Sequence, residues 1–153
     1  MEEITHAQIE DAQEILELQK LAYQSEAAIY NDWSIPPLTE TLAEVKEEFS
    51  KTTFLKLTAD GKIIGSVRIF VKDDCCEIGR LIVHPDIQGK GIGKKLMLSV
   101  EKEFPMAQRF ELFTGSKSER NIYLYEKLGY KIFARKPLSE LVELVFMEKF
   151  RHA

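Results

Sequence analysis

The amino-acid sequence predicts an α+β domain, with one mixed central sheet of about seven strands flanked by about four helices. Short apolar strand-like segments alternate with amphipathic helix-like segments along the chain. An Asp60-Gly61 turn between two apolar runs indicates a β-hairpin. A glycine-rich loop between an apolar run and an amphipathic segment indicates a strand, a tight loop and a helix. The length of 153 residues suits a single domain, 1–153, with a core of its own.

The first half of the chain is expected to hold two helices and four strands. Residues 31–38 are interpreted as a loop, because they surround Trp33 and the pair Pro36-Pro37. The second helix is supported by Leu42, Val45 and Phe49, which share one face. The expected elements are a strand over residues 4–6, helices over 9–22 and 41–50, and strands over 53–59, 62–71 and 75–83.

The second half repeats the alternation of helices and strands. After the glycine loop, Ile92, Leu96, Val100 and Phe104 recur every four residues, as on the apolar face of a helix. The expected elements after this helix are a strand over residues 109–114, a short helix around Tyr125, and strands over 131–135 and 141–149.

Residues 88–95, Gln-Gly-Lys-Gly-Ile-Gly-Lys-Lys, are the most informative part of the chain. Glycine allows positive φ angles and close approach of a ligand to the main chain. The free N–H groups and the dipole at a helix start attract anions. Three lysines, Lys90, Lys94 and Lys95, add positive charge. The loop is therefore predicted to hold a phosphate or pyrophosphate, the alternative being a glycine-rich turn with no ligand.

The glycine spacing decides between phosphate-binding motifs. It fits neither the Rossmann fingerprint nor Walker A, since Lys95 stands where Walker A has Ser or Thr. It does fit Gln/Arg-x-x-Gly-x-Gly/Ala through Gln88, Gly91 and Gly93. A second block, Asn-Ile-Tyr-Leu-Tyr-Glu-Lys-Leu-Gly-Tyr over residues 121–130, follows downstream. In these two blocks the sequence resembles the GNAT family of acetyl-CoA-dependent N-acetyltransferases.

The resemblance implies acetyl-CoA as acyl donor and a set of residues that bind it. Asn121 corresponds to an asparagine that contacts the cofactor or a water in many members; its alternative role is a helix N-cap. The family often separates the strand before the loop from its neighbour at a bulge. The implied cofactor-binding residues are Leu81, Ile82, Val83, Gln88, Gly89, Lys90, Gly91, Ile92, Gly93, Lys94 and Asn121.

Two side chains are implied for the chemistry. Tyr125 corresponds to the family's tyrosine that protonates the departing thiolate; its alternative role is that of a structural hydrogen bonder. Glu77, eleven residues before Gln88, stands where several members carry the general base. Its alternatives are a residue that shapes the acceptor site and a plain surface glutamate.

The implied reaction is direct transfer of an acetyl group to a primary amine of a small molecule or peptide, through a ternary complex. In the family, segments corresponding to residues 23–38 and 136–143 line the acceptor site. A non-catalytic acyl-CoA-binding or regulatory module on the same fold is the main alternative. A nucleotide-binding domain that uses the loop for ATP is a weaker one, because the Walker residues are missing.

Composition narrows the partners and the compartment. A formal net charge of −4 argues against general nucleic-acid binding. Cys75 and Cys76 are adjacent, so they pair poorly and give no metal-site spacing; we expect reduced thiols and no metal. No signal-like segment or apolar run long enough to span a bilayer occurs, so we expect a cytoplasmic protein without membrane contact. The sequence leaves open whether the protein forms a homodimer.

Overall fold

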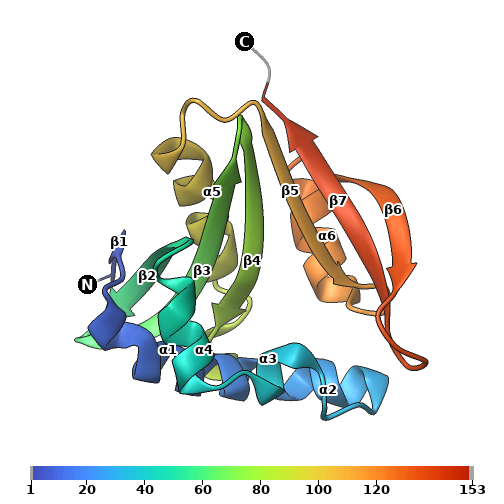
Figure 1. The fold of residues 1–153 in the computed structure, drawn as a ribbon, viewed down its shortest axis with the longest axis horizontal. Coiled ribbons are helices and arrows are strands. Elements are labelled where there is room, and N and C mark those ends of the chain that lie inside the picture. Colours follow the sequence, from blue (N-terminus) through green and yellow to red (C-terminus); the bar gives the residue numbers. More distant parts are fainter. Residues whose placement is uncertain (1, 152–153) are drawn as a thin grey trace.

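The computed structural model describes residues 2–151 and has the predicted mixed sheet of seven strands (Figure 1). The strand order is β1-β2-β3-β4-β5-β7-β6, and only β4 and β5 run parallel to each other. The strands are β1 Glu2–His6, β2 Thr53–Ala59, β3 Lys62–Lys72, β4 Cys75–Val83, β5 Arg109–Gly115, β6 Lys131–Pro137 and β7 Glu143–Phe150.

Helices cover both faces of the sheet (Figure 1). One face of β2, β3 and β4 packs against α1 and α4, and the opposite face of the sheet packs against α5 and α6. Helices α2 and α3 continue from α1 beneath the open side between β4 and β5 (Figure 1). The helices are α1 Ala12–Ala22, α2 Gln24–Tyr30, α3 Pro36–Thr39, α4 Leu42–Glu48, α5 Ile92–Glu103 and α6 Glu119–Lys127, with short 3-10 turns at Ile9–Asp11 and Pro85–Ile87.

The prediction of a loop over residues 31–38 is wrong in part, because Pro36–Thr39 forms the short helix α3. The residues just before this loop, for which no element was predicted, form α2. Tyr23 has a ψ of 0°, which ends α1, and the chain then re-enters a helix as α2. Asn31 ends α2 in the left-handed conformation, with φ of 51°. Pro36 and Pro37 occupy the first turn of α3, where a missing N–H costs nothing. Pro-Pro therefore starts a short helix here instead of marking only a loop.

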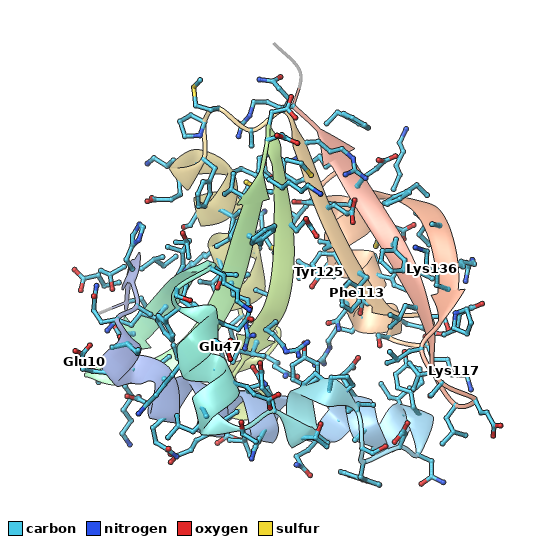
Figure 2. All side chains as sticks on the ribbon, in the orientation of Figure 1. Glu10, Glu47, Phe113, Lys117, Tyr125 and Lys136 are labelled. Atoms are coloured by element: carbon cyan, nitrogen blue, oxygen red, sulfur yellow. The ribbon has the colours of Figure 1, made fainter. Side chains whose placement is uncertain are left out.

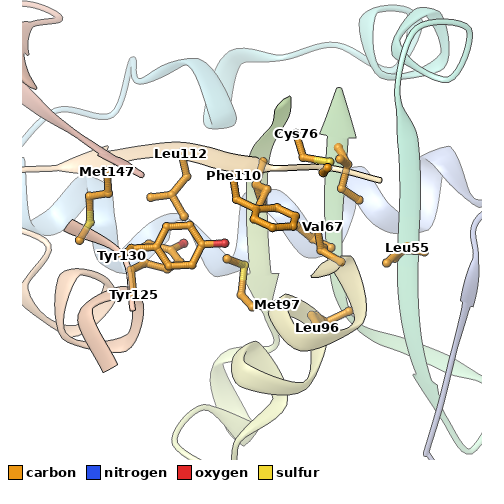
Figure 3. Packing of buried hydrophobic residues seen from close by; sticks show 14 of the residues in the cluster. Leu55, Val67, Cys76, Leu96, Met97, Phe110, Leu112, Tyr125, Tyr130 and Met147 are labelled. Atoms are coloured by element: carbon orange, nitrogen blue, oxygen red, sulfur yellow. The ribbon is translucent and has the colours of Figure 1, made fainter. Parts of the chain in front are cut away.

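The main core lies between the sheet and helices α5 and α6. Figure 3 shows Phe110 and Leu112 of β5 beside Met97 of α5 and Tyr125 of α6. These side chains and twelve others form one buried cluster. Burying an apolar side chain of this size contributes about 1.5–3 kcal/mol. The two elements that flank the glycine loop, β4 and α5, are thus both anchored in this buried cluster.

A bulge in β4 changes the alternation of its side chains between the two faces of the sheet. Cys76 and Ile78 belong to the core on the α5 side, whereas beyond the bulge it is Leu81 and Val83 that pack there. Between them, Arg80 adopts a left-handed φ of 48°. The pairing of β3 with β4 shifts register at the same place. Bulges redirect side chains in this way and frequently adjoin functional sites.

Beyond the bulge β4 also separates from β5. The two strands pair only over Cys75–Glu77 and Arg109–Glu111. The backbone of Leu81, Ile82 and Val83 is therefore unpaired on the side toward β5, as the family resemblance implied. This separation opens the sheet at the end that α2 and α3 underlie.

Candidate functional site

The glycine loop joins β4 to α5 and has the conformation that its sequence predicts. Gly89 and Gly91 both have φ of +82°, a region that residues with a side chain rarely adopt. Gly91 caps the start of α5, a helix of twelve residues. A Cβ added to Gly91 would meet no atom within 4 Å, so its backbone conformation, not crowding by protein atoms, requires glycine. The N–H groups at the start of α5 are left available to an anion.

A pocket of about 360 Å³ lies against this loop, and we call it the loop pocket. Its walls come from the end of β4, the loop, the start of α5, and α2 and α6. Lys94 and Arg120 bring positive charge to it, and Arg120 donates a hydrogen bond to Oε1 of Gln88. Gln88 in turn donates to the carbonyl oxygen of Val83 at 3.3 Å, which ties the loop to β4. The positive charge and the free N–H groups at the loop suit the phosphate groups of a ligand.

Nearly all the residues predicted to bind the cofactor line the loop pocket. The exception is Lys90, which is exposed and lies outside its lining. Lys95 points elsewhere and forms an ion pair of 2.6 Å with Glu2. The lining residues from the prediction are Leu81, Ile82, Val83, Gln88, Gly89, Gly91, Ile92, Gly93, Lys94 and Asn121.

A second pocket of about 260 Å³ opens where β4 and β5 separate, and we call it the strand pocket. It is lined by α2, α3, α6, the two strands and the segment before β7. The loop pocket and the strand pocket share four lining residues: Tyr23, Glu26, Leu81 and Asn121. A ligand in one pocket therefore comes within reach of a ligand in the other.

Tyr125 lines the strand pocket from α6, and Figure 2 shows it beside the opening between β4 and β5. Burial raises the pKa of Tyr125, and the negative charges that Tyr23 and Glu26 can carry raise it further. The hydroxyl therefore keeps its proton at neutral pH. Within residues 2–151 it donates no hydrogen bond to another side chain or to the backbone, so it is free to interact with a ligand.

Polar side chains of α2 form hydrogen bonds with the residues that directly precede α6. Ser118 donates a hydrogen bond to Oε1 of Glu26, and its Oγ lies 2.8 Å from the Tyr30 hydroxyl. That hydroxyl also accepts from the backbone N–H of Lys117 at 2.9 Å. These contacts fix Glu26 on the wall that both pockets share. Glu26 lies in the helical segment that the sequence indicated only as acceptor-lining, so no motif marked it.

Asn121 is the third residue of α6, and Ser118 occupies the N-cap position. The alternative role of Asn121 as a helix N-cap is therefore wrong. Its side-chain amide donates to Oγ1 of Thr114 at 3.4 Å, and the residue lines both pockets.

Glu77 lies away from both pockets. It is exposed on β4 in the stretch that still pairs with β5, opposite Glu111. Gly79, two residues further along the same strand face, does line the strand pocket. Glu77 thus stands one step outside the rim of this pocket, and its role as a base stays a prediction.

Beside the strand pocket, a buried network joins α1, β3, β4 and the turn after α3. Arg68 donates to both carboxylate oxygens of Glu40, at 3.1 and 3.0 Å, and to Gln19 at 3.0 Å. Burial works against the charged carboxylate, but the hydrogen bonds from Arg68 and Gln19 outweigh it and hold the pKa of Glu40 below its usual 4.5. Arg80 lies on the other side of Glu40, with Nε 3.6 Å from Oε1.

The sequence matches the acetyltransferase (GNAT) family over residues 12–130, and the chain therefore belongs to this family. It is 30% identical over 131 residues to the UPF0157 protein YqkA of Bacillus subtilis, covering 86% of this chain and 38% of that protein. It is also 30% identical over 95 residues to the glucosamine 6-phosphate N-acetyltransferase of Schizosaccharomyces pombe, covering 56% of this chain and 85% of that enzyme. The chain thus spans well under half the length of YqkA.

The fold is shared with solved acetyltransferases. The PaiA N-acetyltransferase of Thermoplasma acidophilum, solved in complex with coenzyme A, superimposes with a TM-score of 0.76 at 23% identity, covering 99% of both chains. Among the helices of residues 2–151, none has the length and apolar character to cross a bilayer.

Proposed function

We propose that this chain transfers an acetyl group from acetyl-CoA directly to a primary amine of a small molecule or peptide, with both substrates bound together. The observation that carries the proposal is the shared wall of the loop pocket and the strand pocket. An acyl donor in the first and an amine in the second would meet at that wall. Family membership and the coenzyme A complex of the PaiA enzyme support the choice of donor.

The donor matches the loop pocket in charge. Its pyrophosphate would take the N–H groups at the start of α5, with Lys94 and Arg120 beside it. The unpaired backbone of Leu81, Ile82 and Val83 would hold its extended arm along β4. Acetyl-CoA supplies the thioester, whose acetyl group would then lie toward the shared wall.

The chemistry needs a base for the amine and a proton for the departing thiolate. Glu26 is positioned to take the amine proton, because it lies on the shared wall and Ser118 occupies only one carboxylate oxygen. The amine nitrogen bonds to the acetyl carbon as the carbon–sulfur bond breaks. Tyr125 then donates its proton to the sulfur. Glu77, which stands one step outside the rim of the strand pocket, is the second candidate for the base.

Thiol release from acetyl-CoA, measured with a panel of amines, tests the proposal. The panel contains leucine, leucinamide, spermidine, glucosamine 6-phosphate and a peptide with a free N-terminal alanine. We expect at least one amine to release thiol and to gain one acetyl group by mass spectrometry. The protein could instead bind acetyl-CoA tightly while no amine, in this panel or in a wider screen, releases the thiol. That result would support the non-catalytic acyl-CoA-binding module.

A further inference from the structure

We propose that the strand pocket takes a small amine that also carries a carboxylate and an apolar body, and that Arg80 binds this carboxylate. The inference rests on the proposed acetyl transfer and names the class of its acceptor. It depends on three features of the pocket: the backbone of Arg80, the charge around Glu40, and the apolar walls.

The backbone of Arg80 is strained for its residue type. Four non-glycine residues within 2–151 have positive φ: Asn31, Asp60, Asp73 and Arg80. Asn and Asp tolerate this region, because their short polar side chains bond locally, but arginine has no such compensation. Strained residues persist where the surrounding structure holds them and cluster at ligand sites. Here the strain accompanies the bulge that places Arg80 on the wall of the strand pocket.

The charge of Arg80 is only partly balanced. Both oxygens of Glu40 already accept from Arg68, and Oε1 accepts from Gln19 as well, at 2.8 Å. Nε of Arg80 is 3.6 Å from that same oxygen, too far for a hydrogen bond, and it is buried without a hydrogen-bond partner in the described chain. One carboxylate thus faces two guanidinium groups. An anion in the strand pocket would complete the pairing.

The opposite charge lies on the shared wall. Glu26 lies there, next to the position proposed for the reacting nitrogen. The lining of the strand pocket therefore includes both a carboxylate, that of Glu26, and a guanidinium group, that of Arg80. A molecule with an amine and a carboxylate offers a partner to each.

One stretch of the remaining wall favours an apolar body. It consists of the side chains of Ile35, Pro36, Pro37, Leu138, Val142 and Leu144. A sugar hydroxyl against this stretch would lose its hydrogen bonds to water without replacement. The volume of about 260 Å³ is below the range of about 300–1,000 Å³ usual for drug-sized ligands, which favours a small amine. An amino acid with an apolar side chain fits these limits better than an amino-sugar phosphate.

The test compares leucine with leucinamide, which keeps the amine and the side chain but lacks the negative charge. The quantity measured is kcat/KM for acetylation, in the native protein and in Arg80→Gln. The amide group also changes the pKa of the amine itself, and this effect is the same for every variant. The quantity compared between variants is therefore the ratio of kcat/KM for leucine to kcat/KM for leucinamide. We expect Arg80→Gln to lower this ratio at least about 10-fold, with Arg80→Lys in between. Arg135→Gln, which removes an exposed arginine of β6, should leave the ratio unchanged.

Equal losses for leucine and leucinamide in Arg80→Gln would overturn the proposal and leave Arg80 as a partner of Glu40 only. If Arg80→Gln does not fold, the substrate preference of the native protein tests the proposal instead. A higher kcat/KM for glucosamine 6-phosphate or spermidine than for leucine would also overturn the proposal. Either result keeps acetyl transfer intact. Absence of thiol release with every amine would instead remove the proposed function, and this inference with it.

Discussion

At the scale of single residues, the hydroxyl of Tyr125 is the group whose removal tests the chemistry most cleanly. Tyr125→Phe removes one oxygen and keeps the buried ring in the core. If the hydroxyl protonates the thiolate, kcat should fall by about 100-fold, with little change in either KM. Steady-state rates with an amine that the protein acetylates measure this effect.

Tyr130→Phe is the matched control for Tyr125→Phe. The two rings lie 6.1 Å apart, but the Tyr130 hydroxyl is buried without a hydrogen-bond partner among the described residues. Its removal should leave kcat unchanged and the stability equal or higher, since an unpaired buried hydroxyl is destabilising. Equal losses of kcat in both variants would mean that Tyr125 acts through packing.

The choice of base between Glu26 and Glu77 also belongs to the residue scale. Glu26 lies on the wall shared by the two pockets, whereas Glu77 is exposed outside both. We therefore expect Glu26→Gln to lower kcat by about 100-fold at neutral pH and Glu77→Gln to have a much smaller effect. Measuring kcat for both variants decides the assignment. The reverse order of effects would restore Glu77 as the base.

At the scale of elements, the glycine loop and α5 form the anion site. Gly91→Asp places a negative charge at the helix start and should weaken acetyl-CoA binding at least about 10-fold, or about 1.4 kcal/mol. Gly61→Asp is the matched control. Gly61 also has a positive φ, +77°, and a Cβ added to it would meet no atom within 4 Å, but it lies in the β2–β3 turn. Calorimetric titration with acetyl-CoA measures both. Equal affinities would contradict the pyrophosphate site.

The network around Glu40 connects several elements and predicts a pH-dependent stability. Glu40→Gln should lower the free energy of unfolding by about 3 kcal/mol at pH 7, because Arg68 loses its buried partner. The folded pKa of Glu40 lies below its unfolded value, so its contribution is complete above the unfolded pKa of 4.5 and is lost as pH falls through the folded pKa.

Urea unfolding at pH 7 and at about pH 3 measures this dependence. The difference between the native protein and Glu40→Gln should shrink at the lower pH. Glu47→Gln, in which an exposed carboxylate of α4 is changed, should differ little from the native protein at either pH. If Glu40→Gln lowers the free energy of unfolding by the same amount at both pH values, the loss does not come from the charge of Glu40.

The elements with a clear period or turn signal were predicted correctly from the sequence. The hairpin at Asp60-Gly61 and the amphipathic α5 are examples. The short helix α2 was missed because Tyr23 offers no capping side chain and the helix has only seven residues. The last strand was expected from residue 141, but it begins at Glu143. Before it, the Ser139 hydroxyl accepts from the N–H groups of Leu141 and Val142 and forms a turn.

At the scale of the whole molecule, the sequence predicted the loop pocket well and the strand pocket poorly. Two local motifs carry the family resemblance, and ten of the residues that this resemblance implied for cofactor binding line the loop pocket. The strand pocket arises where β4 leaves β5 and α2 crosses beneath them. Glu26 and Arg80 both line this pocket because of the tertiary structure, and neither lies in a motif that marks its role. Long-range placement of this kind is not encoded in local periodicity.

The central claim is that donor and acceptor are bound together across the wall shared by the two pockets. Initial rates of thiol release, measured while acetyl-CoA and an accepted amine are both varied, test this most directly. We expect double-reciprocal lines that intersect, because both substrates must be present before the acetyl group moves, and a product that carries one acetyl group. Parallel lines, which indicate release of coenzyme A before the amine binds, would contradict the account.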